Sequence, residues 1–367
     1  MNKQTISGRQ IVSIAALFII GSSLILSISS NANEDSWIGF LIAYAAYLPV
    51  LYLYMRLLGH YPGKDIFEIC LEVFGPVAGR IAIALLVWYA VHLGALVLQN
   101  FASFIQVTTF DQMPQVISLM SFAALAIWAS RKGVETVARC SLVMLPILVV
   151  IVALTFVFLA KEMHPEYLLP VGENLSEVPK DALSDFAYPL GETVMLLGIA
   201  SSFGGRACGR KFLIGSVIGA VTILVGGFVR NTMVLGFPLM RDSNFPSFHA
   251  VSIAVVGGFL SRIEAVITAN LLMAGFVKIS VCILAASRGM AKLLNADDQS
   301  PFVAPLGLLM VALGSIVYQS TREIIQFIDV YKYYALPFQI LIPLLLLGVA
   351  EIRMAVQRRA ARKKEPA

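Results

Sequence analysis

Residues 183–203 read LSDFAYPLGETVMLLGIASSF, and this stretch decides the fold. It is apolar enough to cross a membrane, yet Pro189 and Gly191 interrupt it near its middle. Proline removes a backbone hydrogen bond from a helix, and glycine weakens a helix by about 1 kcal/mol. A second interrupted run lies at 9–29, where Gly21-Ser22-Ser23 breaks an apolar segment. Two such runs are typical of membrane helices that open onto a central site.

The whole chain has the composition of an all-α polytopic membrane protein. Of its 367 residues, 58% are hydrophobic and 13% are charged, whereas soluble domains are about 25% charged. This composition excludes a soluble enzyme, and continuous apolar runs exclude an outer-membrane barrel, whose strands alternate. We predict about ten transmembrane helices. Their ranges are 9–29, 37–57, 80–108, 114–130, 140–160, 183–203, 212–237, 263–287, 302–319 and 334–356.

The distribution of positive charge predicts the orientation in the membrane. If the N-terminus is inside, the inner segments hold about three times as many Lys and Arg residues as the outer segments, as the positive-inside rule requires. We therefore expect both termini to be cytoplasmic. The first apolar run is interpreted as a membrane helix and not as a cleaved signal peptide, because nine further runs follow it.

We predict a single membrane domain over residues 1–367, built from two halves. Ten helices divide into five plus five, so that an interrupted helix comes first in each half. This arrangement indicates an inverted-repeat transporter fold with broken helices 1 and 6. The predicted parts are repeat one at about 9–160, an outer loop at about 161–182, repeat two at about 183–356, and a basic cytoplasmic tail at about 357–367.

Three further segments are predicted to lie outside the spans. Residues 63–75 suit a short inner helix, and 245–260 suit a re-entrant outer cap because they are apolar but short. Residues 321–333 have the pattern of an amphipathic helix in the outer interface. The alternative for each segment is simple packing against the bundle.

Charged residues inside spans are candidates for function, because each costs about 3 kcal/mol or more unless it is paired or hydrated. Glu192 follows the break in span six, and Lys278 lies in the middle of span eight. Either could contact a ligand or carry a proton, or the two could form an internal ion pair that fixes the packing. Arg230 lies near the outer end of span seven, where snorkelling to the surface would explain it.

The broken helices suit a small zwitterion. A half-helix N-terminus can donate to a carboxylate, and the freed carbonyl groups can accept from an ammonium group. In span three, Tyr89, His92 and Leu93 share one helical face toward the core. A tyrosine hydroxyl there could contact the same ligand, although simple helix packing remains the alternative.

The sequence shows no catalytic or metal-binding pattern. Four cysteines and four histidines are scattered without metal-ligand spacing, so we expect no enzyme activity, no metal and no cofactor. The basic C-terminal tail indicates contact with anionic membrane lipids, worth about 1 kcal/mol per basic residue. Binding of nucleic acid is the alternative for this tail, and nothing else in the chain supports it.

Several short motifs occur in a characteristic order along the chain. They are ISGRQ, IIGSS, NANEDSWIGFLIA, YPGKDIFEI, LLPVGE, PLGE, VRNTMVLG, SRIEA and FVKIS. In this order the sequence resembles the B-subunit family of nutrient germinant receptors of bacterial endospores (GerAB-like). That spore germination family is a branch of the amino acid–polyamine–organocation (APC) superfamily, whose members have the LeuT-type fold.

The resemblance implies a germinant receptor subunit in the spore inner membrane, a specialised bacterial cytoplasmic membrane. It implies nutrient sensing through a small germinant such as an amino acid, with an A subunit and a C lipoprotein subunit as partners. A proton-coupled APC-type secondary transporter, performing amino acid transport, is the alternative function. With Glu192 added from the reasoning above, the expected ligand-binding residues are Gly21, Ser22, Ser23, Tyr89, Leu93, Leu190, Gly191, Glu192, Val277 and Lys278.

Overall fold

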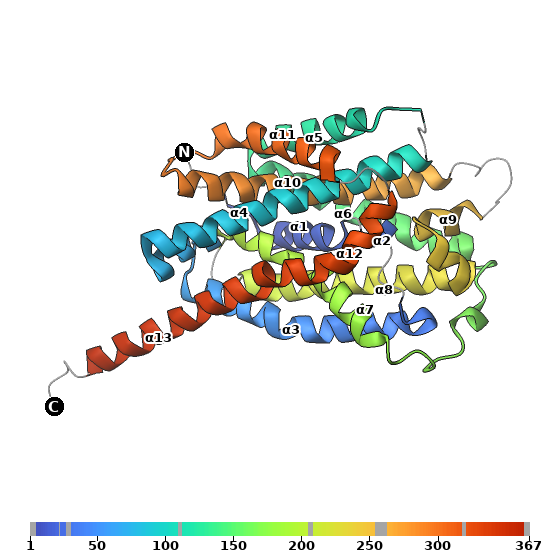
Figure 1. Cartoon of the computed structure of the whole chain (residues 1–367), viewed down its shortest axis with the longest axis horizontal. Helices are drawn as coiled ribbons and strands as arrows, with labels where there is room; N and C mark the ends of the chain where they lie inside the picture. Colours follow the sequence, from blue (N-terminus) through green and yellow to red (C-terminus); the bar gives the residue numbers. More distant parts are fainter. Residues whose placement is uncertain are drawn as a thin grey trace.

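The protein is a bundle of long helices that run roughly along one direction (Figure 1). The computed structural model describes residues 5–21, 23–26, 31–108, 112–204, 208–253, 263–317 and 321–362. Helices occur at every run that the sequence predicts to span. Within the described residues, 7 helices are both long and apolar enough to cross a membrane. The predicted all-helical membrane fold is therefore confirmed.

The first half of the chain begins with a helix that stops inside the bundle. The elements of this half are α1 (Gly8–Ile20), α2 (Ser23–Leu26), η1 (Asn33–Asp35), α3 (Ser36–His60), α4 (Ile66–Thr108), α5 (Gln115–Lys132) and α6 (Val134–Leu159). A connecting segment with the short helix η2 (Pro165–Leu168) leads to the second half.

The second half also begins with a broken helix. Its elements are α7 (Val178–Asp185), η3 (Phe186–Leu190), η4 (Gly191–Ser202), α8 (Cys208–Asp242), α9 (Pro246–Ser252), α10 (Ile263–Leu293), α11 (Ser300–Val317), α12 (Thr321–Leu336), η5 (Pro337–Leu341) and α13 (Ile342–Arg362). The two breaks thus lie in the first helix of each half, as the sequence predicts.

The broken helices occupy the centre of the bundle. Helix α1 is apolar on all sides and packs against α8, α6 and α10, and α10 packs along α4. A helix that is hydrophobic all round is stable only when it is buried. Peripheral helices instead expose large apolar side chains, such as Val143 of α6 at 62% and Trp128 of α5 at 58%. These outward faces suit contact with lipid.

The segments predicted to lie outside the spans have different outcomes. The short helix predicted at 63–75 is present from Ile66, and a non-helical Gly75 (φ 80°, ψ −175°) separates it from the long part of α4. The expected interfacial helix at 321–333 is wrong: α12 continues through η5 into α13, and Tyr331 is 4% exposed. Of the predicted cap at 245–260, helix α9 covers Pro246–Ser252, and residues 254–260 lie outside the described residues.

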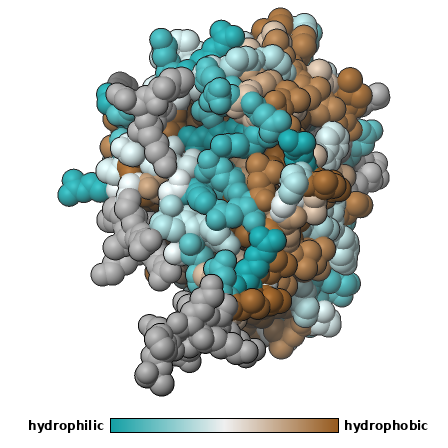
Figure 2. Space-filling model, turned by 90° about the vertical axis from the view of Figure 1, so that its left-hand side faces the viewer, coloured by the Kyte–Doolittle hydropathy of each residue, from teal (hydrophilic) through white to brown (hydrophobic). Residues whose placement is uncertain are grey.

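One end of the bundle is polar, and we call it the inner end. Here α4 begins and α13 extends beyond the other helices (Figure 1). Figure 2 looks onto this end and shows hydrophilic side chains gathered across it, with hydrophobic ones along one side. Ile6 ties the start of the described chain to the end of η4, because its N–H donates to Ser202 O at 2.9 Å. The sequence predicts that this end is cytoplasmic.

Candidate functional site

The break in the first span depends on Gly21. Helix α1 ends at Ile20, and Gly21 has φ 35° and ψ −125°, a conformation that side chains with a Cβ rarely adopt. A Cβ on Gly21 would also lie 2.6 Å from Cδ of Lys278. The glycine therefore both ends the helix and leaves room for the lysine side chain from α10.

The break in the sixth span lies at Tyr188, whose φ of −136° and ψ of 114° are not helical. Gln339 of η5 supplies a partner for a carbonyl group that precedes the break, because its Nε2 donates to Ala187 O at 2.8 Å. After the break, Thr193 Oγ1 donates to Leu190 O at 2.6 Å within the helical segment. A buried carbonyl group left unpaired would be costly, so the bond from Gln339 stabilises the broken conformation.

A buried ion pair joins the two breaks. Lys278 Nζ lies 2.5 Å from Oε2 of Glu192, and both side chains are 0% exposed. The ammonium group also lies 5.5 Å from the ring centre of Phe18 and 5.0 Å from that of Tyr188. Each of these aromatic rings flanks one break, so the lysine contacts both broken helices. Cation–π contacts of this length favour a desolvated ammonium group.

The second carboxylate oxygen of Glu192 has its own partner. Tyr331 OH donates to Glu192 Oε1 at 2.7 Å, and the Tyr331 and Tyr89 hydroxyls lie 2.9 Å apart. Gln339 Nε2 donates to Tyr89 OH at 2.8 Å. A continuous polar network therefore runs from α10 through η4 to α12, α4 and η5.

The structure brings together five of the ten predicted binding residues. Gly21, Tyr89, Gly191, Glu192 and Lys278 belong to this polar site or border it directly. Leu190 is buried next to Gly191 in the chain, and its backbone oxygen accepts from Thr193. The side chains of Ser23, Leu93 and Val277 are buried, and their role in binding stays a prediction. Ser22 lies outside the described residues.

Sequence reasoning missed Tyr331 and Gln339. Tyr331 lies in the segment 321–333 predicted as an interfacial helix, and Gln339 lies near the start of the last predicted span. The available signal was Gln339 itself, a polar residue in an apolar run two residues after Pro337. An amide side chain inside a span is costly unless it is hydrogen-bonded. Gln339 meets this need by donating to the carbonyl oxygen of Ala187, next to the break in the sixth span.

The ion pair is closed off from solvent, because the side chains of Lys278 and Glu192 are both 0% exposed. A separate cavity of about 10 Å³ lies beside η4, lined by Tyr47, Tyr54, Thr193 and apolar side chains, and neither charged residue lines it. Such a volume holds about one water molecule. In the closed site, Lys278 and Glu192 serve as each other's partner.

The sequence offers snorkelling to the surface as the explanation of Arg230, and the structure contradicts it. Arg230 is 2% exposed, and its guanidinium donates to Thr155 Oγ1 at 2.5 Å and to Asn231 Oδ1 at 2.6 Å. Asn231 Nδ2 in turn donates to Ser247, which donates to Leu24 O. The arginine thus stabilises the packing of α8 against α6, α9 and the outer half of the first span.

The fold and the two facing breaks define a multi-pass membrane protein with the LeuT-type transporter fold. Three solved structures are similar. Mhp1, a nucleobase-cation-symport-1 family transporter with bromovinylhydantoin bound, has a TM-score of 0.70 and 12% identity, covering 94% of this chain and 78% of its own. MhsT in complex with L-phenylalanine has a TM-score of 0.69 and 14% identity, covering 95% and 89%. A Na⁺-coupled sialic acid symporter has a TM-score of 0.60 and 13% identity, covering 95% and 78%.

More specifically, the chain belongs to the spore germination protein family, whose model matches residues 5–324. Spore germination protein KB of Bacillus subtilis (strain 168) is 28% identical over 361 residues, which cover 95% of each chain. The putative spore germination protein YfkT of the same organism is 25% identical over 317 residues, covering 86% of this chain and 87% of the relative. The resemblance that the sequence motifs indicate is therefore confirmed.

Proposed function

We propose that this protein is the membrane subunit of a nutrient germinant receptor, and that it binds an amino acid between the two breaks. The observation that carries this proposal is the fully buried ion pair of Lys278 and Glu192. The pair presents one cation and one anion, which are the complements of the carboxylate and ammonium groups of an amino acid. The ligand carboxylate would replace Glu192 at Lys278, and the ligand ammonium would bind Glu192.

Exchange of the internal pair for two ligand contacts leaves the net charge of the site unchanged. No isolated charge is therefore left in the membrane interior, where it would be costly. The ligand needs room, however, so Tyr331 and the helix that carries it must move away from Glu192. A ligand shifts such an equilibrium only through its different affinities for the two states. The state in which Glu192 pairs with Lys278 and the state in which both bind the ligand would be the two states that a receptor reports.

The proposed signal passes to an A subunit and a C lipoprotein subunit in the spore inner membrane, with both termini of this subunit in the cytoplasm. Membership of the spore germination protein family and similarity to a curated spore germination protein support this assignment. Genes for an A-type membrane subunit and a lipoprotein beside this gene would support it further. The basic tail would contact anionic lipids at the inner surface.

The test is nutrient-triggered cation release from dormant spores that lack this gene, complemented with the wild type or with variants. Wild type should restore the response to at least one amino acid in a panel that also contains sugars. Lys278→Met and Glu192→Gln should abolish that response, and the response is compared in spores in which the amount of membrane-inserted variant equals that of the wild type. Arg139→Gln is the matched control, because Arg139 is a cation whose side chain is 72% exposed and pairs with Glu135 at the surface. A full response in Lys278→Met spores would overturn the proposed site.

An APC-type secondary amino-acid transporter is the second candidate, because transporters with bound substrates share the fold. In that function, Glu192 or Lys278 would carry the coupled proton. Counterflow of a labelled amino acid in liposomes that contain the purified protein separates the two. Sustained counterflow that depends on Glu192 would favour the carrier, and binding without counterflow would favour the receptor.

A further inference from the structure

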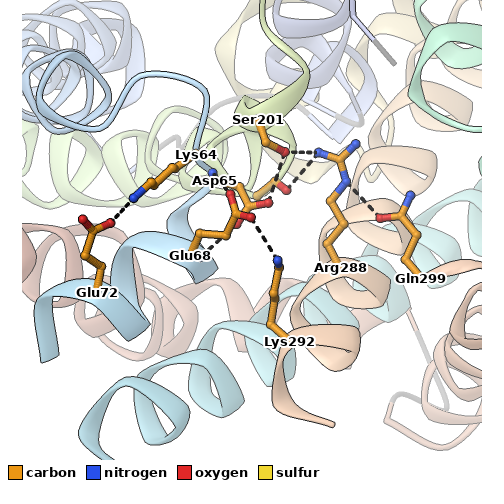
Figure 3. Close-up of polar contacts among 9 residues, drawn as sticks. Lys64, Asp65, Glu68, Glu72, Ser201, Arg288, Lys292 and Gln299 are labelled. Atoms are coloured by element: carbon orange, nitrogen blue, oxygen red, sulfur yellow. Dashed lines mark hydrogen bonds and ion pairs between the residues drawn. The ribbon is translucent and has the colours of Figure 1, made fainter. Parts of the chain in front are cut away.

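The inner end of the bundle contains a second polar site, separate from the ion pair. A cavity of about 360 Å³ lies among the inner ends of α4, α5, η4, α10 and α11. Figure 3 shows the polar contacts among charged and polar residues at this site. Its volume falls in the range of about 300–1,000 Å³ in which proteins bind small molecules. The residues that matter for its chemistry are Asp65, Glu68, Ser201, Ser202, Arg288 and Lys292. Neither Glu192 nor Lys278 lines it.

Arg288 presents a positive charge whose hydrogen-bond partners among the described residues are all neutral, while the carboxylates of Asp65 and Glu68 act on it from a distance. Its guanidinium donates to Gln299 Oε1 at 3.0 Å, to Ser201 Oγ at 3.1 Å and to Ser202 Oγ at 2.8 Å. Lys292 at the same cavity differs, because its ammonium group lies 2.9 Å from Glu68 Oε1. Arg288 therefore keeps the ability to bind an anion, and a guanidinium is suited to a carboxylate.

Asp65 presents a negative charge in a matching position. Its side chain is buried, with one oxygen accepting from the N–H of Glu68 at 3.0 Å and the other from Ser201 Oγ at 3.1 Å. Burial, and then the nearby carboxylate of Glu68, raise the pKa of Asp65. Within the described residues it forms no ion pair. Arg288 and Lys292 lower this pKa from a distance, so the carboxylate faces two cations and still has room for a direct partner such as an ammonium group.

Ser201 connects the two charges. Its single hydroxyl oxygen accepts from Arg288 and donates to Asp65, as Figure 3 shows. The guanidinium and the carboxylate are thus separated by one oxygen atom. A simple anion in this cavity would meet the carboxylates of Asp65 and Glu68, and a simple cation would meet Arg288. A molecule with both charges close together satisfies both sides.

We propose that this cavity is a second binding site, open to the inner side, for a small zwitterion of the amino-acid class. Its carboxylate binds Arg288, and its ammonium group binds Asp65. The occupant also contacts Ser201 and Ser202, the last two residues of η4, whose first residues lie beside the ion pair. The site goes beyond the germinant pocket proposed above and does not depend on it.

The test uses the full-length protein in lipid nanodiscs, with its natural cysteines replaced. Ala296→Cys places a thiol in the lining of the cavity, and Leu294→Cys places one on a 61% exposed side chain that does not line it. The rate of reaction with a charged thiol reagent is measured against L-alanine concentration. We expect L-alanine to protect the thiol at 296 and to leave the thiol at 294 unprotected.

Variants then connect the protection to the two charges. Arg288→Gln and Asp65→Asn should each raise the half-protecting concentration of L-alanine about tenfold or more, because each removes a charged hydrogen bond. Lys278→Met should leave the protection at 296 unchanged, which separates this site from the central one. Acetate and ethylammonium, which carry one charge each, should protect poorly.

Equal protection in Arg288→Gln and Asp65→Asn would overturn the proposal. Loss of protection in Lys278→Met would also overturn it, because L-alanine would then act from the central site. Lack of protection by L-alanine, glycine and larger amino acids, or equal protection by acetate, would exclude a zwitterion site. If Arg288→Gln fails to give a monodisperse protein, the result with Asp65→Asn decides.

Discussion

Gln339 of η5 fills the break in the sixth span. Its amide donates to the carbonyl oxygen of Ala187 at 2.8 Å, and a Cβ on Gly191 would lie 2.1 Å from Gln339 Oε1. Gly191 is therefore required by the close approach of this side chain. Because α12, η5 and α13 are continuous, a displacement of the break is transmitted to the helix that projects from the inner end.

Replacement of Gln339 by leucine should destabilise the protein. The change leaves the carbonyl of Ala187 and the hydroxyl of Tyr89 short of a partner, at a cost of about 1–3 kcal/mol. Thermal unfolding of the purified protein in detergent measures the effect. Gln357→Leu on the exposed part of α13 is the matched control and should leave the melting temperature unchanged. An unchanged melting temperature in Gln339→Leu would mean that water replaces the amide.

The ion pair of Lys278 and Glu192 should show strong coupling in a double-mutant cycle. Lys278→Met or Glu192→Gln alone leaves a buried partner unpaired and should lower the free energy of unfolding by about 3–5 kcal/mol. The double variant should recover much of this loss, because it removes both charges. Additive losses in the double variant would show that the two groups do not depend on each other.

Gly21→Ala tests the first break. The alanine Cβ would meet the Lys278 side chain at 2.6 Å at a positive φ, so we expect a loss of about 1–3 kcal/mol in stability. Gly215→Ala in α8 is the control, since nothing lies within 4 Å of its added Cβ. Its better helix propensity should raise stability by up to about 1 kcal/mol. Gly21→Leu should in addition abolish the nutrient response, and an unchanged dose response would place the pocket elsewhere.

Asp65 should make stability depend on pH in the acid range. Because burial raises its pKa in the folded protein, the folded state binds this proton more tightly than the unfolded chain. Its contribution to stability is therefore full below the ordinary aspartate pKa of about 4. The contribution is lost as the pH rises through the higher folded value. Asp65→Asn should therefore show a flatter profile of melting temperature against pH above about pH 4, the ordinary aspartate value. An identical slope in both proteins would contradict this role.

Much of the fold was predictable because the hydrophobic pattern is strong. Long apolar runs and the interruptions at Gly21 and Pro189 are local features, and the structure confirms both breaks. Glu192 and Lys278 were also identifiable as costly charges in spans. Their pairing was one of two interpretations of the sequence, and the structure selects it.

The contributions of Tyr331, Gln339 and Arg230 were not predictable from local pattern. Tyr331 belongs to the segment 321–333, whose amphipathic pattern also suits a helix on a membrane surface, and Gln339 belongs to the predicted span 334–356. Only tertiary packing determines which partners these two side chains meet. Arg230 lies near the end of a span, where snorkelling and internal hydrogen bonding have the same sequence signal. Tertiary contacts decide between these outcomes, because the partners lie far away in the chain.

The winding of η4 has a mechanical consequence. Its 12 residues form a 3₁₀ helix, which rises about 2.0 Å per residue, compared with 1.5 Å in an α-helix. Conversion of the whole segment to α-helical winding would shorten it by about 6 Å and rotate one end relative to the other by about two-thirds of a turn. Glu192 and Ser201 stand at opposite ends of this segment. A change of helical pitch alone would therefore couple a rotation to an axial displacement between the membrane centre and the inner surface.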